Sequence, residues 1–141
     1  MVKIIIQENN LTVQQFEYLY KSTGCPLFSS SQVRQSLKND VYHISAWIEN
    51  EIVGMGRLLG DMAMYWYIQN LIVLPEYQSI GVGTTIMNYL LTFVRNNSLS
   101  NSQAVIGLMC SEHTASFYQK FSFDIRPCDS LGPGATLELN L

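Results

Sequence analysis

The chain has 141 residues, of which 48% are hydrophobic and 13% charged, and its formal net charge at pH 7 is −3. This composition excludes a disordered chain and predicts a single domain over residues 1–141. The 8 Lys and Arg residues form no basic tract, so nucleic-acid binding is not expected. The three cysteines lack the spacing of a disulfide framework or a zinc site, and no apolar run has the length of a signal peptide or a membrane span. We therefore expect a soluble cytoplasmic protein without a metal and without membrane contact.

Hydrophobic patterning in the first half predicts two helices and three strands. Thr12 and Gln15 have the spacing of a capping box, so a helix is expected to begin there. A cluster of serines at residues 29–31 predicts the start of a second, more polar helix, which runs to about Asn39. Strands are predicted over residues 2–7, 41–48 and 52–59, the last two joined as a hairpin.

The second half alternates strands with helices. A strand over residues 64–74, a helix over 84–96 and a strand over 104–109 form a β-loop-α-β unit, which requires a parallel strand pair. A short helix and two more strands are predicted beyond it, over residues 114–120, 122–126 and 136–141. The expected fold is α/β, with a mixed sheet of six or seven strands flanked by about four helices.

The loop between strand 64–74 and helix 84–96 carries Gly81 and Gly83. A glycine-bearing loop that opens a helix presents backbone N–H groups at the positive end of the helix dipole, which suits a phosphate or pyrophosphate. A Walker A loop would need Lys and Ser or Thr after its last glycine, but Thr84 follows Gly83. A dinucleotide-binding loop would need a third glycine and an acidic residue about twenty positions on, and both are absent.

Two motifs resemble those of the GCN5-related N-acetyltransferases. Gln78, Gly81 and Gly83 match the family's Gln/Arg-x-x-Gly-x-Gly/Ala pattern, and residues 115–123 resemble its Phe-Tyr-x-Lys-x-Gly-Phe segment. The order of strands and the spacing of the motifs also agree, so the resemblance spans nearly the whole chain. It implies a protein that uses acetyl-CoA as co-substrate and acetylates a primary amine by direct attack in a ternary complex.

The resemblance also assigns roles to residues. Cofactor contacts are implied along the strand end and the loop, at Leu71, Ile72, Val73, Gln78, Ser79, Ile80, Gly81, Val82, Gly83 and Thr84. The strand residues would pair with the pantetheine arm and place an N–H near the thioester oxygen, where a preorganised donor stabilises the developing oxyanion. The loop would bind the pyrophosphate. Tyr118 matches the position of the general acid that protonates the leaving thiolate.

The general base is left open among Glu51, Asp61, Glu112, His113 and water. Many family members carry an acidic residue where this chain has Asn70, and Asn cannot act as a base. Ser122 likewise replaces the usual glycine of the second motif, which places the turn geometry in question. Arg57 lies in an otherwise apolar strand and either pairs with Asp61 or Glu51 or faces the acceptor cleft; we favour the structural ion pair. His43 is expected to be a hydrogen-bonded structural histidine.

The acceptor is expected to be a small-molecule or peptide amine. Its pocket is predicted where the first helix, residues 22–29 and strand 64–74 meet, with an aromatic lining from Tyr20, Phe28, Trp47, Tyr65 and Tyr67. A homodimer is expected, as in many relatives. Two alternatives stay open: a non-catalytic acyl-CoA-binding or regulatory module, and a nucleotide-binding signalling domain.

Overall fold

A five-stranded mixed sheet organises residues 1–108, the first of two compact units in the computed structural model, which describes residues 1–141. The strands lie side by side in the order β1 (Ile5–Glu8), β2 (Tyr42–Ile48), β3 (Glu51–Gly60), β4 (Tyr65–Val73) and β5 (Val105–Gly107). The first four are antiparallel, and β5 pairs with β4 in parallel. The parallel pair predicted from the β-loop-α-β unit is thereby confirmed.

Local sequence signals set the ends of the elements. Helices α1 (Val13–Lys21) and α2 (Ser30–Asn39) each begin with a capping box, formed by Thr12 with Gln15 and by Ser29 with Gln32. The hairpin between β2 and β3 turns through Glu49 and Asn50, whose φ angles of 48° and 68° are both positive, as a two-residue type I′ turn requires.

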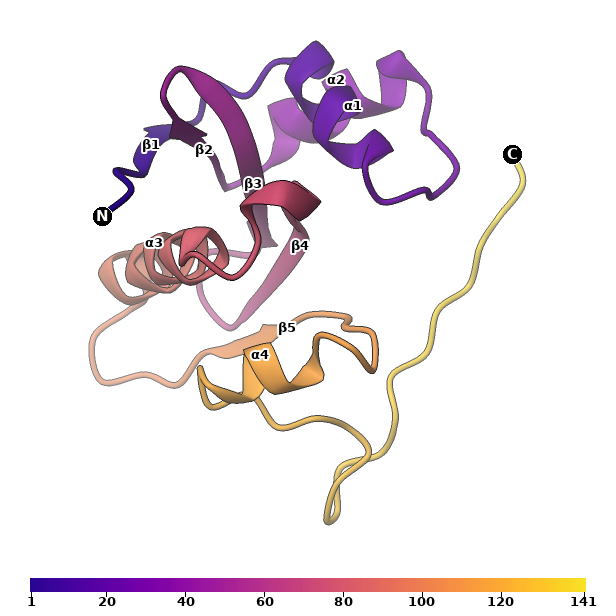
Figure 1. Ribbon diagram of the computed structural model, residues 1–141. Helices are drawn as coiled ribbons and strands as arrows, with labels where there is room; N and C mark the ends of the chain where they lie inside the picture. Colours follow the sequence, from indigo (N-terminus) through magenta and orange to yellow (C-terminus); the bar gives the residue numbers. More distant parts are fainter. The chain divides into compact units, whose positions relative to one another are not determined.

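The two faces of β3 carry helices on opposite sides. Met55 belongs to the apolar cluster under α1, and the guanidinium carbon of Arg57 lies 5.8 Å from the centre of the Phe16 ring of that helix. On the other face, a side chain at Gly56 would put its Cβ 2.6 Å from Cγ2 of Ile86 in α3 (Val82–Asn97). Figure 1 accordingly shows α3 across β3 and β4 from α1 and α2. Glycine in β3 therefore lets α3 lie directly on the sheet.

Residues 109–141 form the second unit, whose one helix is α4 (Ala115–Gln119). The strands predicted over 122–126 and 136–141 are absent, and an isolated bridge between Cys128 and Leu131 is the only β-pairing in this unit. The leucines at 137, 139 and 141 alternate as a strand would, yet all three are exposed. Alternation defines the face of a strand but supplies no neighbour to complete its hydrogen bonds, and without one no strand forms.

The α/β prediction of a mixed sheet with about four helices is confirmed, with five strands in place of six or seven. None of the helices combines the length and the apolar character needed to cross a membrane.

Candidate active site

A short loop connects β4 to α3 and contains most of the predicted cofactor residues. After a 3-10 helix, Pro75–Tyr77, the Gln78 side chain donates a hydrogen bond to the Val73 carbonyl at 3.0 Å and so ties the loop to the end of β4. Ser79 and Gly81 both have positive φ, 65° and 97°, and Gly81 caps α3. Glycine suits this position because its left-handed conformation costs other residues about 1–2 kcal/mol.

The loop presents a row of free backbone donors. The first bond of α3 runs from the Thr85 N–H to the Gly81 carbonyl at 3.0 Å, and none of the amides from 79 to 84 donates to a protein acceptor. Gln78–Gly81 and Thr84 are exposed, whereas Leu74 and Val82 are buried and hold both ends of the loop. Unpaired amides at a helix N-terminus carry partial positive charge, which favours an anion. These residues fit the pyrophosphate of coenzyme A.

The end of β4 has one open edge beside this loop. Strand β5 pairs with β4 only from Tyr65 to Tyr67, so the backbone from Ile68 to Val73 has no strand on that side. Leu71, Ile72 and Val73, predicted to contact the pantetheine arm, lie on this edge. An extended chain with amide groups can pair with such an edge as an added strand does.

A bulge interrupts β4 in the same region. The step of two residues from Met55 to Arg57 in β3 is matched by a step of three from Ile72 to Gln69 in β4. Asn70 lies within that step and has a φ of 52°. A bulge of this kind re-aims the side chains around it.

Arg57 connects Asn70 to a buried carboxylate. Its Nε and Nη2 donate to the two oxygens of Asp40 at 2.8 and 2.6 Å, and its Nη1 donates to Oδ1 of Asn70 at 2.7 Å. The Asp40 side chain is fully buried, and Nδ1 of His43 lies 3.2 Å from it. Nε2 of His43 accepts the Leu11 N–H at 3.3 Å, so the remaining ring hydrogen lies on Nδ1 and points at Asp40. The structural role predicted for His43 is confirmed.

A cavity of about 330 Å³ opens beside Asn70 and Arg57. Helix α2 contributes Gln32, Val33, Gln35 and Ser36 to its walls, and the aromatic part of the lining is Phe16 and Phe28. Gln69 completes it. Arg57 is the one charged residue of this lining, which holds neither a carboxylate nor a histidine.

The lining of this cavity differs from the aromatic lining predicted for the acceptor pocket. Of its five residues only Phe28 lines the cavity. Tyr20 stacks on Phe16 and packs on Phe28, and the Trp47 indole N–H donates to Ser45 at 2.8 Å. These residues were chosen because they lie in segments expected to meet, and that choice does not specify which side chains face one cavity.

The predicted partners of Arg57 are also wrong, although the ion pair itself is present. Asp61 instead accepts the backbone N–H groups of Ala63, Met64 and Tyr65. These bonds, led by that from Tyr65, lower the pKa of Asp61, which disfavours it as a base. Glu51 is exposed at the start of β3. Sequence reasoning missed Asp40; the one available signal was that a buried Arg requires a carboxylate.

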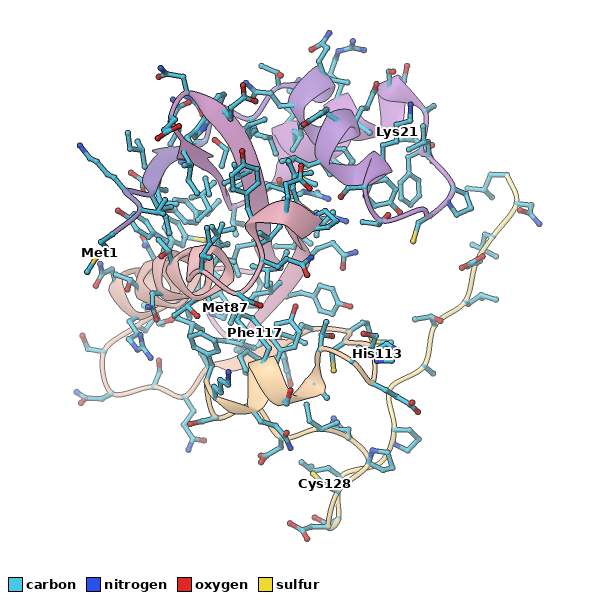
Figure 2. The ribbon with its side chains drawn as sticks, viewed as in Figure 1. Met1, Lys21, Met87, His113, Phe117 and Cys128 are labelled. Carbon is cyan, nitrogen blue, oxygen red and sulfur yellow. The ribbon has the colours of Figure 1, made fainter.

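The second unit holds the remaining candidates. Tyr118 on α4 is 7% exposed, and its ring centre lies 5.1 Å from that of Phe117 and 6.1 Å from that of Phe123. Burial, with a smaller contribution from Cys110, raises the pKa of Tyr118. Glu112 and His113 are exposed in the segment that precedes α4, and Figure 2 labels His113 and Phe117 there.

Ser122 stands where the family's second motif has glycine, and the turn at this position is present nonetheless. Its φ is 70°, and the N–H groups of Phe121 and Phe123 both donate to the Tyr118 carbonyl. The serine therefore adopts the left-handed conformation that glycine would adopt more readily.

The sequence model of the acetyltransferase (GNAT) family matches residues 9–123. The chain belongs to this family. It is 23% identical over 128 residues to the ycf52-like N-acetyltransferase of Prochlorococcus marinus, itself uncharacterized. That match covers 88% of this chain and 69% of the relative, so the chain spans about two thirds of the relative's length.

Solved acetyltransferase structures share the fold. A Staphylococcus aureus protein of unknown function, described as a probable acetyltransferase, superposes with a TM-score of 0.84 at 20% identity over 97% of this chain and 100% of that protein. The PaiA N-acetyltransferase of Thermoplasma acidophilum, solved with coenzyme A, has a TM-score of 0.65 at 14% identity over 92% and 94% of the two chains. At these identities the likeness establishes a common GNAT fold.

Proposed function

We propose that this chain is an N-acetyltransferase that transfers the acetyl group of acetyl-CoA to a primary amine by direct attack in a ternary complex. The row of unpartnered amides from 79 to 84, beside the open edge of β4, is the observation that carries the proposal. Membership of the acetyltransferase family supports it independently.

In this proposal the amides from Ser79 to Thr84 bind the pyrophosphate, and Leu71 to Val73 pair with the pantetheine arm. When bound, acetyl-CoA supplies an activated acetyl thioester. Ser36 is the one hydroxyl side chain that lines the cavity, and no histidine lies in the lining to activate it. Direct attack by the amine therefore fits the cavity better than an acyl-enzyme.

Tyr118 is proposed as the general acid that gives its proton to the leaving sulfur. The phenol holds that proton at neutral pH, as tyrosine ordinarily does, and burial raises its pKa further. We expect Tyr118→Phe to lower kcat with a good acceptor while the Kd for acetyl-CoA stays unchanged. An unchanged kcat at neutral pH would remove Tyr118 from the mechanism.

The cofactor site is tested with two glycine variants. Gly81 and Gly24 both have positive φ, 97° and 74°, and a Cβ on either would meet no atom within 4 Å. Both alanine variants therefore carry a similar backbone strain of about 1–2 kcal/mol. We expect only Gly81→Ala to weaken acetyl-CoA binding in calorimetry, roughly tenfold, which corresponds to about 1.4 kcal/mol. Equal affinities in the two variants would place the cofactor elsewhere.

A non-catalytic acyl-CoA-binding module is the second candidate, and the absence of a carboxylate from the cavity lining favours it. Release of free thiol from acetyl-CoA, measured against a panel of amines, separates the two. Thermal stabilisation by acetyl-CoA without thiol release on any amine would support the binding module. Stabilisation by ATP or NAD but not by CoA would support the nucleotide-binding alternative. A homodimer and a cytoplasmic location stay predictions.

A further inference from the structure

The amide of Asn70 is fixed in one orientation by the residues behind it. Arg57 can only donate hydrogen bonds, so the atom of Asn70 that lies 2.7 Å from its Nη1 must be the carbonyl oxygen. The amide nitrogen then lies on the other side of the Asn70 side chain, with two N–H donors. This orientation follows from the chemistry of the guanidinium group and needs no choice between two similar amide rotamers.

Arg57 is itself held in place. Two of its nitrogens are bound to the fully buried carboxylate of Asp40, which also receives the Nδ1 hydrogen of His43. Arg57 is only 6% exposed, and its guanidinium lies over the Phe16 ring. A bidentate arginine–carboxylate pair has a well-defined geometry, so the chain from Asp40 through Arg57 to Asn70 is rigid.

The amide nitrogen of Asn70 has no partner in the protein. Asn70 accepts one hydrogen bond and donates none, and the one buried side-chain nitrogen or oxygen without a partner is Nε1 of Trp66. The Asn70 nitrogen is therefore accessible, and Asn70 lines the cavity. Each nitrogen of Arg57 is already bonded once, and two of its five N–H groups remain after three bonds. Asn70 and Arg57 therefore offer hydrogen-bond donors to the cavity, and neither of them can act as a base.

The charge, apolar contacts and size of the cavity indicate which class of molecule these donors would bind. With a single cation and no carboxylate in the lining, a polyamine would find no countercharge for a second ammonium group. Phe16 and Phe28 offer apolar contact. A volume of about 330 Å³ is at the small end of ligand pockets and suits a molecule of amino-acid size.

We propose that Asn70, oriented by Arg57, binds a carbonyl or carboxylate oxygen next to the amine of the acceptor. The acceptor is then an α-amino acid unit with an apolar side chain, which packs against Phe16 and Phe28. This inference rests on the proposed acetyl transfer, because it assigns the acceptor of that reaction. A free amino acid, an amino acid amide and a peptide N-terminus share this chemistry.

The test compares acceptors with and without a carbonyl group next to the amine. Phenylalaninamide and phenethylamine carry the same ring and amine, and phenethylamine lacks the carbonyl group. We expect kcat/KM, corrected for the fraction of unprotonated amine, to be at least tenfold higher for phenylalaninamide. Phenylalanine and a Phe-Gly dipeptide then distinguish a free amino acid from a peptide N-terminus, and spermidine is expected to be a poor acceptor.

Asn70→Asp is the decisive variant. An aspartate keeps the contact with Nη1 of Arg57 but replaces the two N–H donors with an acceptor, and it would repel a substrate carboxylate. We expect the ratio of the kcat/KM values for the two acceptors to fall at least tenfold, mainly through KM. This ratio is compared at one pH, so the different basicities of the two amines cancel. Asn50→Asp is the matched control, since Asn50 is exposed, has a φ of 68° and lies in the hairpin turn.

Failure of this inference is distinct from failure of acetyl transfer. If amines are acetylated without a preference for the carbonyl group, or if the preference survives Asn70→Asp, the Asn70 subsite is wrong while the transferase stands. If no amine is acetylated, calorimetric titration of phenylalaninamide and phenethylamine into the CoA-loaded protein still decides. Tighter binding of phenylalaninamide that Asn70→Asp abolishes would support the subsite, and equal binding would overturn it.

Discussion

Removing the charge of Asp40 is expected to destabilise the first unit strongly. The carboxylate is fully buried and binds Arg57 through two hydrogen bonds of 2.8 and 2.6 Å. In Asp40→Asn only one oxygen remains to accept, and the buried guanidinium loses its countercharge. Breaking a buried ion pair from one side costs about 3–5 kcal/mol. For a chain of this size we expect the melting temperature to fall by about 10 °C or more.

The assay is urea unfolding followed by tryptophan fluorescence, because both tryptophans, Trp47 and Trp66, lie in the first unit. Asp61→Asn is the control with the same loss of charge. Its carboxylate is exposed and accepts backbone N–H groups, which an amide oxygen can also do, so the stability of this variant should stay close to that of the wild type.

A double-mutant cycle separates the ion pair from other effects of the substitution. Arg57→Met alone leaves the Asp40 charge buried with only the His43 hydrogen bond, whereas the double variant with Asp40→Asn leaves no buried charge. We expect the double variant to be less destabilised than the sum of the single variants by about 2 kcal/mol or more. Additive costs, or an Asp40→Asn variant as stable as the wild type, would refute this account of the pair.

Gly56→Ala should cost about 1–3 kcal/mol in urea unfolding, since its Cβ would lie 2.6 Å from Cγ2 of Ile86. A cost below about 0.5 kcal/mol, the usual range of neutral substitutions, would mean that α3 shifts freely. Ser122→Gly should raise the melting temperature in calorimetry through a gain of up to about 1 kcal/mol, because serine at a φ of 70° is strained, and a lower melting temperature would contradict that strain. Burial, and then the hydrogen bond to Glu8, raises the pKa of Tyr42, so its stabilising effect is complete below about pH 10, the value in unfolded chains, and is lost as the pH rises above it. The free energy of unfolding should therefore fall as the pH rises above about 10, and less so in Tyr42→Phe. Because the cavity lining holds neither a carboxylate nor a histidine, kcat/KM should rise with pH toward the pKa of each acceptor amine, and a midpoint common to all amines would indicate a protein base.

The elements that sequence predicted well are those whose signals are local. The capping boxes at Thr12 and Ser29 begin α1 and α2 where expected, because a cap and its partner lie three residues apart. The loop around Gly81 was found for the same reason, since its glycines and the flanking strand and helix are contiguous. Strand 136–141 failed because pairing depends on a distant neighbour that alternation does not specify.

The part of the site that is built by residues far apart in the sequence was not predicted. Asp40 and Arg57 are seventeen positions apart, and Arg57 reaches Asn70 across a bulge that shifts the register by one residue. A one-residue shift decides which side chains face the cavity, and no sequence pattern around Asn70 signals it. The cavity lining contains neutral amides such as Gln69, which the sequence did not predict there.

The buried pair has a consequence that links stability to recognition. A well-packed apolar pair of similar volume often stabilises a fold as much as a buried ion pair or more, so Asp40 and Arg57 are a costly way to fill the space under α1. What apolar residues could not do is hold the oxygen of Asn70, at a φ of 52°, away from the cavity. With an apolar pair in place of Asp40 and Arg57, the Asn70 side chain would be free to rotate, and it could present either its oxygen or its nitrogen to the cavity. The ion pair thus makes the cavity wall a donor of hydrogen bonds, and the proposed preference for amines with a neighbouring oxygen depends on this property.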